Sequence, residues 1–231
     1  MIPVEVAPDP QTLAALAADR VVARAEEAVR GRGRFTLAVS GASTPRGMFA
    51  ALADRPLPWG DVHLFQVDER VAPDGDPDRN LTDLTALLVE RVPIPKENVH
   101  PMPVTASDLE VAARAYAVEL AEVTGDGALD LVHLGIGDDG HTASWPPGDP
   151  VVDADGEGAP DVAVVGPYNG RLRMTLTPRA VNRARAVLWL VQGAGKAPVV
   201  GRLLAGDPGI PASRVPTERA LLLATTDAVP A

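Results

Sequence analysis

The ten-residue segment Gly135–Ser144, GIGDDGHTAS, combines residue types suited to chemistry on a small ligand. Its three glycines permit positive φ angles and close approach of a ligand, and two carboxylates and an imidazole lie within four consecutive residues. Histidine is the natural general base near neutral pH, so we expect His141 to be the working group. Asp139 lies two residues before it, where it could orient the imidazole or contact the substrate.

Two other interpretations of this segment fit less well. A dinucleotide-binding turn would place its third glycine at Gly140 and start a helix there, yet the following HTASWPP contains two prolines. Asp138, Asp139 and His141 could instead ligate a metal, but four consecutive residues rarely surround one ion without a distant ligand. We therefore expect no metal.

A second candidate segment, Ser40–Pro45 (SGASTP), lies between a predicted strand and a predicted helix. Small residues there let backbone N–H groups approach an anion, Ser43 or Thr44 can cap the helix, and the helix dipole favours phosphate. An ordinary strand-to-helix turn with a Ser/Thr cap explains the same pattern. The segment alone does not separate a phosphate site from such a turn.

A third segment, Asp68-Glu69-Arg70, ends a predicted strand, where open α/β sheets bind their ligands. Arg70 suits bidentate phosphate binding, and Asp68 suits orientation of a sugar hydroxyl or a cation. Three charged residues after a strand are also typical of a chain that leaves the sheet and enters solvent. Lys196, in GAGK after another strand, either adds charge to a phosphate site or is a solvated lysine.

Other basic residues and histidines carry less information. Arg171 and Arg173 flank a predicted strand and are individually uninformative. His63 and His133 lie inside predicted strands and are expected to be structural, while His100 is expected in a loop without a role.

Composition limits the class of protein. With 231 residues, 46% of them hydrophobic, the chain can bury a full core, and we expect one domain over residues 1–231. The net charge of −10 argues against nucleic-acid or anionic-membrane partners. There is no cysteine, no leader pattern and no apolar stretch of membrane-spanning length, so a cytoplasmic protein is expected.

The elements that must position these segments alternate along the chain. Short apolar runs predict strands at Phe35–Val39, Val62–Val67 and Leu129–Leu134, and later runs at Val162–Val165, Met174–Leu176, Ala186–Val191 and Leu221–Ala224 could extend the sheet. Helical patterns occupy Pro10–Arg30, Pro45–Asp54, Asn80–Arg91, a segment from a Ser107–Glu110 capping box to Gly125, and Ala197–Leu204. This order predicts an α/β fold with a mostly parallel, Rossmann-like sheet covered by helices on both faces. Asp149–Pro160 is predicted as a surface loop, with a lid as the alternative.

Taken together, these segments resemble the glucosamine-6-phosphate isomerase/6-phosphogluconolactonase family, and within it the lactonases of the pentose phosphate pathway. The matching segments are SGASTP, DER with Asn80 downstream, GIGDDGHTAS, RMTLT at Arg173–Thr177 and GAGK ending at Lys196. The resemblance runs from Phe35 to about Leu204. It implies a single α/β domain, no cofactor, and hydrolysis of a small phosphorylated sugar lactone, 6-phospho-D-glucono-1,5-lactone, by general-base activation of water.

The resemblance also implies roles for individual residues. His141 corresponds to the general base and Asp139 to the aspartate two residues before it, while Arg70 and Lys196 correspond to phosphate-binding residues. The substrate-binding set expected from the matching segments is Gly41, Ser43, Thr44, Asp68, Arg70, Asn80, Arg173 and Lys196. The chain departs from the family pattern at Ala42, where a glycine is usual, and at Trp145 and Pro146, where leucine and phenylalanine are usual.

Two alternative functions would each require a further sequence feature. A glucosamine-6-phosphate deaminase needs a glutamate shortly after the histidine, and the stretch SWPPGD has none. A sugar-phosphate sensor domain would accompany a DNA-binding helix-turn-helix, whereas the 34 residues before the first predicted strand form one helical pattern. The chain is expected to be a monomer or a small homo-oligomer.

Overall fold

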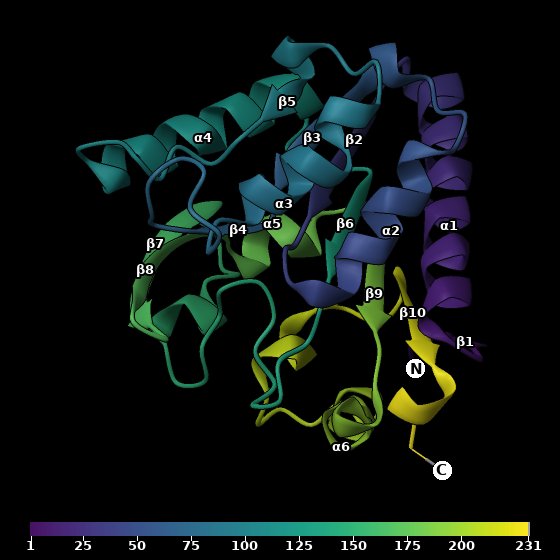
Figure 1. Ribbon diagram of the computed structural model, residues 1–231. Coiled ribbons are helices and arrows are strands. Elements are labelled where there is room, and N and C mark those ends of the chain that lie inside the picture. Colours follow the sequence, from purple (N-terminus) through teal and green to yellow (C-terminus); the bar gives the residue numbers. More distant parts are fainter. Residues whose placement is uncertain (231) are drawn as a thin grey trace.

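A seven-stranded parallel sheet forms the centre of the computed structural model, which describes residues 1–230 (Figure 1). Its strand order is β1-β10-β9-β6-β2-β3-β5. The strands are β1 (Val4–Ala7), β2 (Phe35–Val39), β3 (Val62–Gln66), β5 (Val99–His100), β6 (Leu131–Leu134), β9 (Val187–Val191) and β10 (Ala220–Thr225). Every neighbouring pair in this sheet is parallel, which confirms the predicted fold class.

Helices cover both faces of the sheet. They are α1 (Pro10–Arg32), α2 (Ser43–Ala53), α3 (Asn80–Leu87), α4 (Leu109–Thr124), α5 (Pro178–Asn182) and α6 (Ala197–Leu204). Short 3-10 turns lie at Trp59–Asp61, Val89–Arg91, Lys96–Asn98, Pro150–Asp153, Ala194–Lys196, Pro211–Arg214 and Thr226–Ala228. Side chains alternate along each strand, so Phe35, Leu37 and Val39 of β2 pack in one core with α1, α2 and α3. Ala38 packs in the other core, which holds α4, α5 and α6.

The order in which strands are added to the sheet reverses between β2 and β6, which are parallel neighbours. From β2 the chain continues to β3 on one side, and from β6 it continues to β9 on the other. Ligands of open α/β sheets bind at such a switch point, outside the carboxyl ends of the strands. The segments Ser40–Pro45 and Gly135–Ser144 follow β2 and β6, so the topology brings them together at this point.

A second, antiparallel sheet differs from what the sequence predicted. It has the order β4-β8-β7 and consists of β4 (Asp68–Arg70), β8 (Arg171–Leu176) and β7 (Val162–Tyr168). The expectation that Val162–Val165 and Met174–Leu176 extend the main sheet is therefore wrong. Asn169 and Gly170 explain the difference, because both have positive φ, 50° and 77°, and so form a two-residue hairpin turn. Such a turn joins antiparallel strands, whereas parallel neighbours need a crossover.

Helix boundaries differ from the predictions by small shifts with local causes. The N-cap of α4 is Asp108, one residue after the predicted Ser107, because the side chain of Asp108 accepts the hydrogen bond from the N–H of Val111. Helix α1 runs on to Arg32 and stops at Gly33, which takes the left-handed conformation. His100, expected in a loop, is the second residue of β5 and contacts Glu119 at 2.6 Å. No helix within residues 1–230 has the length and hydrophobicity to cross a bilayer.

His133 on β6 is fully buried, in agreement with its predicted structural role. Its Nδ1 accepts the N–H of Ser40 at 3.3 Å, and burial lowers its pKa to about 3. The unfolded chain binds this proton near pH 6.5 and the folded chain does not, so folding stability is fully present above pH 6.5 and declines as the pH falls toward 3.

We therefore expect acidification from pH 6.5 to pH 5 to lower the free energy of unfolding, with a contribution from His133 of up to about 1.4 kcal/mol per pH unit. Chemical denaturation of the protein and of His133→Gln at several pH values measures this contribution as the difference between the two slopes. Equal slopes would contradict the assignment, whatever the absolute stability of the variant.

Candidate active site

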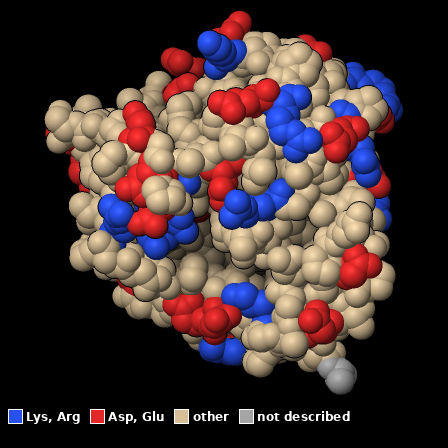
Figure 2. Space-filling view, viewed as in Figure 1, with Lys and Arg blue, Asp and Glu red and all other residues tan. Residues whose placement is uncertain are grey.

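A cavity of about 240 Å³ lies at the switch point of the main sheet. Loops that follow β2, β6 and β9 form part of its wall, and the start of α2, the end of β9, β4, α3 and β8 provide the rest. Figure 2 shows a hollow near the centre of the visible face, with basic side chains on several sides of it. The lining includes nine of the ten predicted site residues, namely Gly41, Ser43, Thr44, Asp68, Arg70, Asn80, His141, Arg173 and Lys196. Asp139 is the exception, because it contacts His141 but does not line the cavity.

His141 is held by two side chains. Its Nδ1 lies 2.6 Å from Asp139 Oδ1 and 3.0 Å from the hydroxyl oxygen of Tyr168, and that hydroxyl donates to Asp139 Oδ2 at 2.7 Å. Burial alone would raise the pKa of Asp139, but the hydrogen bonds from Tyr168 and His141 outweigh it and lower this pKa to about 2. An ionised carboxylate only accepts, so Nδ1 carries a proton, and in the neutral imidazole this leaves the lone pair on Nε2.

The glycines of this loop make the arrangement possible. A side chain at Gly137 would collide with the imidazole of His141 and crowd the carboxylate of Asp139. The N–H of Gly137 donates to the carbonyl of His141 at 2.8 Å, and Thr142 Oγ1 donates to the carbonyl of Gly135 at 2.8 Å. These two hydrogen bonds hold the loop in a fixed conformation, in which the imidazole of His141 packs on Gly137.

The start of α2 forms another part of the wall. The helix begins at Ser43, with Ala42 at the N-cap and no side-chain capping bond, so the expectation that Ser43 or Thr44 caps it is wrong. Both residues lie inside the first turn, where backbone N–H groups have no partner within the helix. Gly41 packs so closely on the amide of Asn80 that a Cβ would overlap it. This part of the wall thus presents N–H groups and a helix N-terminus, which favour an anion.

Ala42 has φ 101° and ψ −177°, a region that is almost exclusive to glycine. Strain of this kind costs about 1–3 kcal/mol, and glycine loses about 0.5–1 kcal/mol through its larger unfolded-state entropy. We therefore expect Ala42→Gly to raise the free energy of unfolding by about 1 kcal/mol in urea titrations. Ala212→Gly, at a buried alanine outside the cavity, is the control and should be destabilising. A loss of stability in Ala42→Gly would contradict the strained conformation.

Glu69, the middle residue of β4, has a structural role. It is fully buried and accepts the N–H groups of Asn80 and Leu81 at 2.8 and 2.9 Å, which satisfies the first turn of α3. Arg79 forms an ion pair with it at 3.0 Å. Asn80 in turn donates from Nδ2 to the carbonyl of Asp68 at 2.9 Å. This network fixes the two neighbours of Glu69, which both line the cavity.

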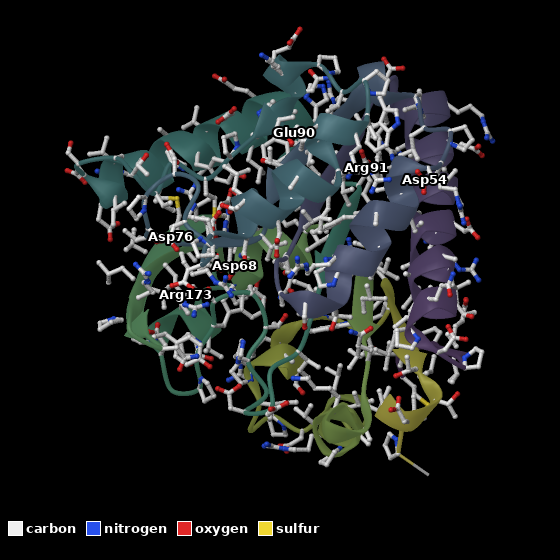
Figure 3. The ribbon with its side chains drawn as sticks, in the orientation of Figure 1. Asp54, Asp68, Asp76, Glu90, Arg91 and Arg173 are labelled. Carbon is white, nitrogen blue, oxygen red and sulfur yellow. The ribbon has the colours of Figure 1, made fainter. Side chains whose placement is uncertain are left out.

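Asp68 and Arg173 lie next to each other on paired strands (Figure 3). Their closest oxygen and nitrogen atoms are 4.0 Å apart, and Ser144 Oγ donates to Asp68 Oδ2 at 2.7 Å. Burial raises the pKa of Asp68, although the hydrogen bond from Ser144 and the charges of Arg70 and Arg173 act against it. This buried polar group is suited to recognition of hydroxyls.

The two predicted phosphate-binding cations already have partners. Arg70 donates to the carbonyl of Asp78 at 2.6 Å, which leaves its charge uncompensated by that contact. Lys196, at the end of a 3-10 turn before α6, forms an ion pair with Asp138 at 2.6 Å. Asp138 and Asp139 therefore serve different partners. A phosphate would have to compete with Asp138 for Lys196.

The segment Asp149–Pro160 and the residue Trp145 lie away from the cavity wall. None of Asp149–Pro160 lines the cavity, and Val151 and Val152 of this segment are buried in the core. Trp145 is fully buried and donates from Nε1 to the carbonyl of Leu176 at 2.7 Å. The departure from the family pattern at Trp145 thus changes the core and not the cavity wall.

Tyr168 is the main site residue that the sequence did not reveal. The Asn-Gly pair after it predicts a hairpin turn, which would have placed Tyr168 at the end of a strand. That signal does not say where the hairpin packs. Ser144, inside the predicted loop but not predicted to bind, is the other.

Comparison with known proteins places the chain in one family. The family model for glucosamine-6-phosphate isomerases/6-phosphogluconolactonase matches residues 8–223. A 6-phosphogluconolactonase from Synechocystis is 39% identical over 81% of this chain and 78% of its own length, and one from Streptomyces coelicolor is 33% identical over 86% and 81%. The solved structure of a 6-phosphogluconolactonase from Trypanosoma brucei covers 99% of this chain and 97% of its own, with a TM-score of 0.85 and 28% identity. The chain belongs to the glucosamine-6-phosphate isomerase/6-phosphogluconolactonase family.

Proposed function

We propose that the protein hydrolyses 6-phospho-D-glucono-1,5-lactone to 6-phosphogluconate, a step of the pentose phosphate pathway. The observation that carries the proposal is His141, whose Nδ1 is bound to an ionised Asp139 and whose ring lines a cavity with Arg70 and the start of α2 in its wall. A base and an anion site at one cavity suit hydrolysis of a phosphorylated ester. Relatives that carry the lactonase name support the same assignment.

In the proposed mechanism, Nε2 of His141 removes a proton from a water molecule as its oxygen attacks C1 of the lactone. Asp139 stabilises the imidazolium that forms. The bond between C1 and the ring oxygen then breaks, and the imidazolium returns the proton to that oxygen. The product is a carboxylic acid that ionises, so each turnover releases one proton to the solvent.

We assign substrate binding to the cavity residues that lie outside the His141 loop. Arg70 and Lys196 would bind the phosphate together with the N–H groups around Gly41, Ser43 and Thr44. Asp68, Asn80 and Arg173 would orient the sugar hydroxyls. Because Asp138 neutralises Lys196 in the free protein, phosphate binding exchanges one ion pair for another and Arg70 contributes most of the new attraction.

An assay with three substrates tests this function. Acid release from the phosphorylated lactone should exceed the spontaneous rate in proportion to enzyme concentration, and glucosamine 6-phosphate should yield no ammonia. The unphosphorylated lactone should react with a much higher KM. Ammonia release would favour the deaminase, and tight binding without any turnover would favour a sensor domain.

The proposal also covers the cellular compartment and the oligomeric state of the protein. A doubly charged phosphate ester does not cross an apolar bilayer unaided, so the enzyme must work where its substrate forms. We propose the cytoplasm as that place. We also propose a monomer or a small homo-oligomer, because one chain provides every residue assigned to the cavity.

A further inference from the structure

Tyr168 reaches the base from a different part of the fold. It ends β7 in the antiparallel sheet, whereas His141 and Asp139 lie in the loop after β6 of the main sheet. The two rings meet edge to face, with centroids 5.4 Å apart. Among the described residues, Tyr168 is thus the only tyrosine whose hydroxyl contacts both His141 and Asp139.

The hydrogen-bond geometry gives the hydroxyl two roles. Its single proton goes to Asp139 Oδ2 at 2.7 Å, since the ionised carboxylate can only accept. Nδ1 of His141 also carries a proton, so the 3.0 Å contact with Tyr168 makes the phenol oxygen its second acceptor, beside Asp139 Oδ1. The three side chains therefore form a cyclic hydrogen-bond network. Every donor in it has an acceptor only when His141 carries its proton on Nδ1.

Tyr168 is itself held in place. The guanidinium of Arg173 lies over its ring, 5.0 Å from the centroid, and Arg173 Nε donates to its carbonyl at 3.3 Å. Burial and the hydrogen bond to Asp139 raise the pKa of Tyr168 to about 12, which keeps the hydroxyl protonated at working pH. Arg173 also lines the cavity beside Asp68. Tyr168 therefore connects the residues assigned to bind the sugar hydroxyls with His141.

We infer that Tyr168 is a positioning residue, which fixes His141 in the Nδ1-protonated tautomer with Nε2 free to accept the proton of the attacking water. The inference rests on the proposed lactonase function. Tyr168 does not line the cavity, so it acts on the reaction through His141 and Asp139 and not through the substrate.

The variant Tyr168→Phe removes the hydroxyl and keeps the ring under Arg173. We expect kcat for the phosphorylated lactone to fall about tenfold, as for loss of one hydrogen bond to a charged group, with KM within twofold of the parent. Leu172→Ala is the matched control, because Leu172 is an exposed side chain on the same hairpin and should leave both constants unchanged. In an Asp139→Asn background, the further cost of Tyr168→Phe should shrink to less than threefold.

A second measurement does not depend on activity. The ¹⁵N chemical shifts of the His141 ring at pH 8 report its tautomer, and Tyr168→Phe should raise the share of the Nε2-protonated form while Leu172→Ala should not. An unchanged kcat, an unchanged tautomer, or an equal cost in the Asp139→Asn background would overturn the inference. An inactive parent protein whose tautomer still shifts would instead refute the lactonase function and leave the positioning role standing.

Discussion

Replacing His141 with alanine should lower kcat for hydrolysis of the phosphorylated lactone at least about a hundredfold, because the general base is lost. KM should change by less than about threefold, since the assigned phosphate and hydroxyl contacts lie on other elements of the cavity wall. Free imidazole should restore part of the rate, because the truncated side chain leaves room for it beside Asp139. Steady-state acid release with and without imidazole measures both effects.

The control for this variant is His63→Gln, which changes a half-buried histidine at the other end of β3, outside the cavity wall. It should keep the parent kcat. Lactone hydrolysis that survived His141→Ala intact, or a rate that imidazole did not raise, would show that another group activates water.

Replacing Arg70 with glutamine should lower kcat/KM for the phosphorylated lactone by about 10- to 100-fold, the loss expected for a charge-assisted contact. The loss should fall mainly on KM, because the phosphate is remote from the reacting carbon. Arg70 is expected to carry more of the binding than Lys196, whose charge is shared with Asp138 in the free protein.

The unphosphorylated lactone provides the internal comparison for Arg70→Gln, since its kcat/KM should remain within about twofold of the parent. Arg55→Gln, at a partly exposed arginine that follows the C-terminal end of α2, pairs with Asp19 and does not line the cavity, should affect neither substrate. Equal losses on both lactones would mean that Arg70 acts on the fold or on the sugar ring and not on the phosphate.

Much of the fold follows from local patterns. The central strands β2, β3 and β6 are buried on both faces, so they stand out as apolar runs followed at once by polar loops. The edge strand β1 alternates Glu5 with valines over four residues and gives no such signal. Strand β4 consists of three charged residues and exists because it pairs with β8, which is a tertiary effect that no local propensity contains.

The candidate site divides in the same way. His141 and the glycine loop could be found because their chemistry is contiguous in the sequence, and Gly137 shows why the loop needs a glycine there. Contacts between distant elements could not be found. Tyr168 lies 27 residues from His141 in another sheet, and Lys196 lies 58 residues from its partner Asp138. Such pairings depend on how the loops and the hairpin pack, which residue spacing does not encode.

Hydrolysis of a phosphorylated lactone by a base in the loop after β6 should appear as acid release that depends on His141. The most direct test is to follow acid release from 6-phospho-D-glucono-1,5-lactone in a weakly buffered solution, with the parent protein and with His141→Ala at equal concentration. We expect the parent to accelerate acid release above the spontaneous rate in proportion to its concentration, and the variant to lose nearly all of this acceleration. Acid release at the spontaneous rate with the parent protein, or at equal rates with both proteins, would contradict it.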